Sequence, residues 1–159
     1  MHTQTILFEE DSRRLSEVCH RLYLSVYARA VFLLDKDGQM LASEGEVDGI
    51  DTTSLASLTA GNIAATGGLA KLLGEPEFPV QVHEGERESI HISLIGERLI
   101  LVILFDGRSS LGLIRLKLKH VSADLLAISN EIFNKSAQEV SLGFTEISDD
   151  DIDEFFRTS

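Results

Sequence analysis

The residue types that most often carry enzyme chemistry are few in this chain and lack productive spacing. Its five histidines are scattered, and none stands at the spacing of zinc ligands. His83-Glu84 does not begin a metalloprotease motif, because Arg87 occupies the position of the second histidine. There is no GxSxG motif, and the single cysteine, Cys19, has no evident activating neighbour. We therefore expect no catalytic centre and no metal site in this protein.

A second feature, the segment from Gly67 to Leu72, superficially resembles a phosphate-binding loop. Such a loop needs a glycine directly before its lysine and a serine or threonine directly after it. Lys71 has neither of these neighbours. No dinucleotide-binding fingerprint is present elsewhere, so we expect neither a bound nucleotide nor any other cofactor.

The most informative stretch is the segment from Asp51 to Gly74, which is predicted to form one long helix. It carries no charge from Thr52 to Ala70, although 25% of the residues in the chain are charged. Successive helical residues lie about 100° apart, and this spacing separates a bulky side from a small one. The bulky side contains Leu55, Leu58, Leu69, Leu72 and Leu73. The opposite side contains Ala56, Ser57, Ala60, Gly61, Ala64, Gly67 and Gly68.

We interpret the small side of this helix as its outward surface, with Lys71 as the only charge. A surface helix normally places charged residues there. Each glycine inside a helix costs about 1 kcal/mol relative to alanine, so several of them indicate that something approaches this backbone closely. The expected occupant is another protein, bound by Ser57, Ala60, Gly61, Ala64, Gly68 and Lys71.

This helix has two other interpretations. It could be sandwiched inside a large core, which would also explain small residues on one side and bulky ones on the other. A membrane-spanning helix is the second alternative, because the segment has the required length of about 20 residues. We reject the membrane helix because the segment is too polar, with Ser54, Ser57, Thr59, Asn62 and Thr66.

Composition limits the class of protein further. A chain of 159 residues with 43% hydrophobic residues can form one compact domain with a tail. The net charge of −12 disfavours non-specific attraction to nucleic acid or anionic lipid. One cysteine excludes an internal disulfide framework, and Cys19 lies at helical spacing from Leu15 and Leu22, which predicts that it is buried. The first residues lack the pattern of a secretory signal, so a cytoplasmic location is expected.

The order of predicted elements indicates an α+β fold. Hydrophobic periodicity predicts a first helix over Glu10–Val26 and a hairpin of two strands around an Asp-Gly turn. The predicted strands are Ala30–Leu34, Gln39–Ser43, Val80–His83, Ser89–Ile95 and Arg98–Phe105, with the apolar last one at the centre of the sheet. Asp51 or Thr52 caps the long helix, and a final helix starts near Ser109 or Ser110 and runs through Ile132. We expect a five-stranded antiparallel sheet with helices on both faces.

The C-terminal part is predicted to lie outside this domain, which would span residues 1–136. The pattern from Ser136 to Gly143 is that of a linker, and residues 137–159 are assigned to this linker and a short acidic amphipathic segment after it. Ile147 and Ile152 have the spacing of a hydrophobic staple around a Ser148 cap, and Phe155 and Phe156 add an apolar patch. This segment is either a docking peptide that contacts a partner or a frayed acidic tail.

The element order and several sequence segments resemble the Roadblock/LC7 family. The segment GQMLAS leads into the long small-residue helix, as in this family. Four further segments are similar to a bacterial member of the family that regulates a Ras-like small GTPase: FLLDKDGQ, IDTTSLASLTAGNIAATGGLAKLLGE, FDGRSSLGLIRLKLK and EISDDDIDEFF. The resemblance implies a homodimer in which the long helices pair and the Val80–His83 strands join two sheets. It also implies that one dimer binds one GTP-bound GTPase and accelerates hydrolysis, without an arginine finger, by repositioning the catalytic residues of the GTPase. The acidic tail would make a second contact linked to nucleotide exchange, and the setting would be cell polarity and gliding motility, at a cell pole.

Three alternatives stay open at this point. Arg108, in a predicted turn, could act as an arginine finger, which is worth about 10³–10⁵-fold in rate where it operates. The protein could be a dimeric scaffold that binds a GTPase or a motor subunit without changing its rate. It could also be a small-molecule binding module on a PAS-like or profilin-like sheet, although we find no set of converging polar groups in the sequence.

Overall fold

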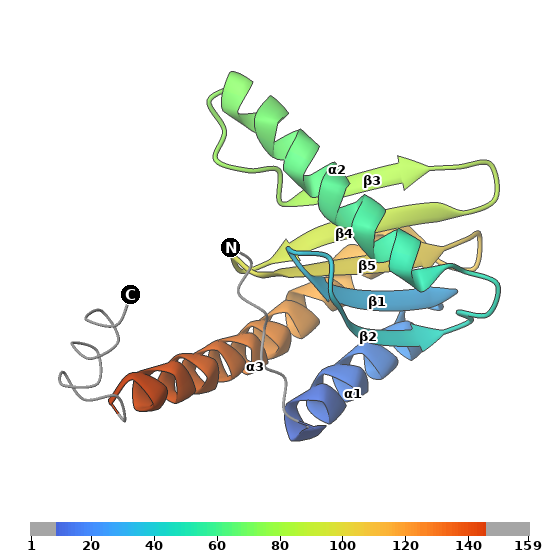
Figure 1. The fold of residues 1–159 in the computed structure, drawn as a ribbon. Coiled ribbons are helices and arrows are strands. Elements are labelled where there is room, and N and C mark those ends of the chain that lie inside the picture. The colour runs from blue at the N-terminus through green and yellow to red at the C-terminus, as the bar shows by residue number, and fades with distance from the viewer. Residues whose placement is uncertain (1–8, 146–159) are drawn as a thin grey trace.

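The computed structural model describes residues 9–145, which form an antiparallel sheet with helices on both faces (Figure 1). The elements in chain order are α1 (Glu9–Ser25), β1 (Ala30–Asp35), β2 (Met40–Gly45), α2 (Thr52–Leu72), β3 (Val80–Glu84), β4 (Ser89–Ile95), β5 (Leu99–Phe105) and α3 (Leu111–Thr145). The five strands lie in the order β2-β1-β5-β4-β3, and all neighbouring pairs are antiparallel. Helices α1 and α3 cover one face, and α2 crosses the other. The predicted α+β order is confirmed.

The central position of β5 follows from its composition. All seven of its residues are buried, because the strand has apolar side chains on both faces and both faces carry helices. The predicted hairpin between β1 and β2 is also confirmed. Its Gly38 has a φ of +92°, a backbone conformation that glycine adopts without a steric penalty.

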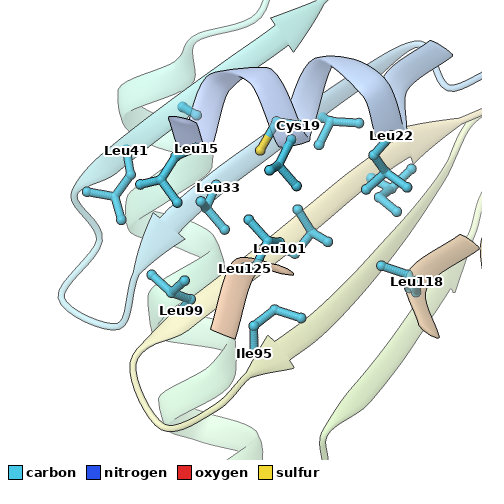
Figure 2. Close-up of a cluster of buried hydrophobic side chains, with 14 of the residues drawn as sticks. Leu15, Cys19, Leu22, Leu33, Leu41, Ile95, Leu99, Leu101, Leu118 and Leu125 are labelled. Atoms are coloured by element: carbon cyan, nitrogen blue, oxygen red, sulfur yellow. The ribbon is translucent and has the colours of Figure 1, made fainter. Parts of the chain in front are cut away.

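The sheet separates two apolar cores. The larger core lies under α1 and α3 and contains Leu15, Leu22, Leu33, Leu101 and Leu125, among other fully or nearly buried side chains (Figure 2). Cys19 belongs to this core, as its spacing predicted, and burial raises the pKa of its thiol to about 12. The smaller core lies under α2 around Phe32, Ile100 and Val102.

The start signals of the helices are those expected from the sequence. Asp51 is the N-cap of α2, where its Oδ1 accepts a hydrogen bond of 3.0 Å from the Ser54 amide. Hydrogen bonds from Ser54 lower the pKa of the Asp51 carboxyl. Ser110 precedes α3, and its hydroxyl accepts a hydrogen bond from the Leu113 amide.

The end of α3 differs from the prediction. Residues 136–143, expected to be a linker, continue the helix, which ends at Thr145. The apolar repeat stops at Ile132, but alanine, glutamine and glutamate beyond it are good helix formers. Extending an existing helix adds one hydrogen bond per residue without a new nucleation penalty, so the polar segment stays helical. The division of the chain at residue 136 stays a prediction, and Ile147, Ile152, Phe155 and Phe156 lie outside the described residues.

Candidate functional site on helix α2

Helix α2 runs obliquely across one face of the sheet, and its later half lies next to the edge strand β3 (Figure 1). Side-chain hydrogen bonds connect the two elements. The Asn62 amide nitrogen donates to Gln81 Oε1 at 2.8 Å, and Gln81 Nε2 donates to Thr66 Oγ1 at 2.8 Å. Sequence reasoning missed Gln81, because an edge-strand glutamine carries no local sign of its partner. These bonds fix the position of α2 against β3.

The side of α2 that faces the sheet is a narrow stripe of small residues. Its buried members are Ala56, Thr59 and Ala70, which share one side of the helix at helical spacing. Leu55 and Ile63 are half-buried and pack against the smaller core. The helix therefore buries only a small part of its surface against the sheet.

The position of the leucines corrects one part of the sequence interpretation. Leu58, Leu69, Leu72 and Leu73 lie on the surface, with 74%, 55%, 82% and 72% of their area exposed. The buried stripe therefore lies between the leucine side and the small-residue side, and both sides reach solvent. A charged face normally shows which side of a helix points to solvent, and α2 has no such face. Hydrophobic periodicity alone therefore did not determine which side of α2 packs against the sheet.

The residues predicted to bind a partner lie together on the outward side of α2. Ser57, Gly61, Ala64, Gly68 and Lys71 are exposed, and Ala60 is half-buried. Ala60 lies close to the hairpin turn, since a Cβ built on Gly38 would stand 3.5 Å from the Ala60 Cβ. The structure thus joins these six residues into one surface, which we name the α2 ridge.

The glycines of α2 are not required by packing within this chain. A Cβ added to Gly61, Gly67 or Gly68 would meet no atom within 4 Å. Alanine would be about 1 kcal/mol more favourable at an open helical position of this kind. Neither packing nor helix propensity within the described chain explains glycine at these positions.

Arg108, the candidate arginine finger, is paired within its own turn. Its Nε donates to the two carboxylate oxygens of Asp106 at 3.0 and 3.2 Å, and its Nη1 lies 3.8 Å from Glu46 Oε1. The pairing with Asp106 raises the pKa of Arg108 and lowers the pKa of Asp106. The Arg108 side chain is 55% exposed, and these hydrogen bonds hold its guanidinium against Asp106.

A family profile named Roadblock/LC7 domain matches residues 15–105, which is more than half of the chain. This chain belongs to the Roadblock/LC7 family. Among solved Roadblock structures, MglB from Myxococcus xanthus is 50% identical, with a TM-score of 0.76 over 80% of this chain and 96% of that one. The gliding protein MglB from Thermus thermophilus is 35% identical, with a TM-score of 0.75 over 82% of this chain and 99% of that one.

A third Roadblock structure extends the comparison to assembly. It is described as MglB with a tetrameric arrangement, and it is 33% identical with a TM-score of 0.77 over 83% of this chain and 99% of that one. No curated protein sequence matches this Roadblock chain at a significant level.

Neither a metal centre nor a membrane-spanning helix is found among the residues that the structure describes between 9 and 145. Within that range no group of three or more histidine, cysteine, aspartate or glutamate residues could hold a metal ion. None of the helices described there has the length and apolar character needed to cross a membrane. The α2 ridge is the candidate site, an exposed surface of small and nearly uncharged residues.

Proposed function

We propose that this Roadblock protein is a homodimeric activator of a Ras-like small GTPase of the MglA type, acting in cell polarity and gliding motility. The observation that carries the proposal is the α2 ridge, which is exposed, almost uncharged and built from small residues over a helix fixed to its sheet. The similarity to MglB structures at 33% to 50% identity supports the same assignment.

A second copy of the chain is the proposed neighbour at the β3 edge. The later half of α2, which carries exposed leucines, reaches the edge of the sheet formed by β3 (Figure 1). Edge strands carry backbone groups without a strand partner on one side, so pairing of two β3 strands would satisfy them. The two α2 helices would then form one continuous surface for the GTPase.

The proposed mechanism is positional. A rigid, closely approaching ridge can press on the GTPase and shift its own catalytic residues into place, which lowers the barrier by orientation. The protein itself is then not an enzyme. The segment that contains Ile152, Phe155 and Phe156 would make a second contact on the GTPase, linked to nucleotide exchange.

A GTP hydrolysis assay with the cognate Ras-like protein tests the ridge. Ala64→Arg with Gly68→Arg is expected to abolish the stimulated rate, because two long charged side chains would stand where the partner must approach. The fold should survive, since both positions are exposed and a Cβ at Gly68 meets open space. Normal stimulation by this double variant would overturn the assignment. If the wild-type protein binds the GTPase without changing its rate, it is a scaffold instead.

The same assay decides between the positional mechanism and an arginine finger. Arg108→Ala is expected to stimulate hydrolysis almost normally, because Arg108 is paired with Asp106 and Glu46. An arginine finger would instead show a rate loss of about 10³-fold or more. A loss of that size would establish Arg108 as the catalytic group and replace the positional mechanism.

A further inference from the structure

A second surface lies on the opposite face of the sheet from the α2 ridge. Along β4, the side chains of Ile90 and Ile92 face the core under α2, so His91 and Ser93 face the side of α3. A groove of about 450 Å³ runs there between α3 and the β3–β4 edge. Its floor contains His91 and Ser93, and its far wall is α3.

The floor of this groove holds polar atoms without partners. His91 is 1% exposed and Ser93 is 5% exposed. Among the residues that the structure describes, neither ring nitrogen of His91 nor the hydroxyl of Ser93 has a hydrogen-bond partner. Buried polar groups are nearly always hydrogen-bonded in native proteins, so this pair requires an explanation.

The α3 wall adds two cations. Arg115 and Lys119 are exposed, stand four residues apart on one side of the helix, and line the groove. Neither forms an ion pair within residues 9–145. The remaining surface of the groove is largely apolar, from Val80, Ile95 and Leu118.

We propose that this groove binds a small amphiphilic carboxylate. The carboxylate would accept hydrogen bonds from His91 and Ser93 and would lie opposite Arg115, while its apolar body would pack on Val80, Ile95 and Leu118. Such a site combines apolar walls with a few converging polar groups, and its volume is in the usual range for small ligands. The proposal does not depend on the GTPase assignment, because the groove and the α2 ridge lie on different faces of the sheet.

Pairing of two β3 strands leaves this groove available. Strand pairing uses the backbone groups at the edge of β3, whereas the groove is formed by side chains that point away from the plane of the sheet. The ligand and a second copy can therefore be distinguished by experiment.

A titration of the full chain with octanoate, followed by ¹H–¹⁵N NMR of the amides and the histidine rings, tests the proposal. Octanoate is expected to give saturable shifts at the His91 ring and the Ser93 amide. Octanol, which has the same body without the charge, is expected to bind about tenfold more weakly. An absence of saturable shifts at His91, or equal affinity for octanol, would overturn the proposal.

Variants on α3 supply the matched control. Arg115→Gln is expected to weaken octanoate binding about tenfold, since it removes a charge-assisted contact. Lys117→Gln removes an equal charge from the same helix outside the groove and is expected to leave the affinity unchanged. Equal affinities of the two variants would contradict the proposal. If the His91 signals shift with protein concentration but not with octanoate, the groove is occupied by a second copy of the chain. That result would also overturn the proposal of a carboxylate ligand.

Discussion

At the scale of single residues, His91 has the most unusual environment in the described chain. Burial and the nearby positive charge of Arg115 both disfavour its protonated form and lower its pKa below the ordinary value of 6.5. The unfolded chain therefore binds a proton at higher pH than the folded one does. Stability contributed by the neutral ring is fully present above pH 6.5 and decreases as the pH falls below it.

We predict that the free energy of unfolding of the wild-type protein falls between about pH 7.5 and pH 5, and that His91→Gln shows a flatter profile. Urea unfolding at a series of pH values measures the free energy of unfolding of the wild-type protein and of the His91→Gln variant. The carboxyls of Asp51, Asp106 and Glu131 also have lowered pKa values, but their contributions are lost only at more acidic pH. Parallel profiles of the two proteins in this window would show that His91 is not responsible.

The sequence predicted the environment of a single residue correctly where hydrophobic periodicity determined whether that residue is buried. Cys19 was expected to be buried because it repeats with Leu15 and Leu22, and it lies fully in the core. The unpartnered state of His91 and the pairing of Arg108 with Asp106 could not be predicted in this way. Both depend on which atoms of other residues lie within a few ångströms, and spacing along the chain does not specify that.

At the scale of elements, α2 shows what composition can and cannot specify. The absence of charge, the Asp51 cap and the glycines correctly indicated one long helix with an exposed ridge of small residues. The rotation of the helix could not be predicted, because a polar face normally marks the outward side and α2 has none. The predicted end of α3 was wrong for a related reason, since its last turns carry no apolar repeat.

The glycines of α2 lead to a prediction about stability. Gly68→Ala is expected to raise the free energy of unfolding by about 1 kcal/mol, because alanine is the better helix former and the added Cβ meets open space. Gly67→Ala is the matched control at the neighbouring position, with the same open space and the same expected gain. Urea unfolding of each variant measures the change. A loss of stability for Gly68→Ala alone would show that another copy already packs against this part of the helix.

At the scale of the whole molecule, the two faces of the sheet differ in how much their helices cover. The larger core is closed by α1 and α3, and an ion pair of 2.5 Å between Arg14 and Glu131 joins these helices. On the other face α2 buries three of its residues and leaves Leu58, Leu69 and Leu72 exposed, and Leu73 at its C-cap is exposed as well. Exposed apolar residues that gather at one side of a molecule commonly mark an interaction surface.

The proposed dimer predicts how this surface responds to charge. Leu69→Glu with Leu72→Glu is expected to give a monomer, because each copy would bring two uncompensated carboxylates into an apolar contact. Light scattering after size-exclusion chromatography measures the mass. Leu116→Glu, on the exposed side of α3 where 55% of the leucine is accessible, is the control and should leave the mass unchanged. A double variant with the wild-type mass would place the interface elsewhere.

The length of α3 has a mechanical consequence. Its 35 residues form a rod of about 50 Å, which is packed against the sheet and α1 from its start to Ile132, about two thirds of its length. The turns beyond Ile132 are about 20 Å long, so a tilt of about 5° where they leave the packed part would displace their tip by about 2 Å. Small rearrangements at the groove or at the α1 contact would therefore be transmitted as translations to whatever the chain carries after Thr145.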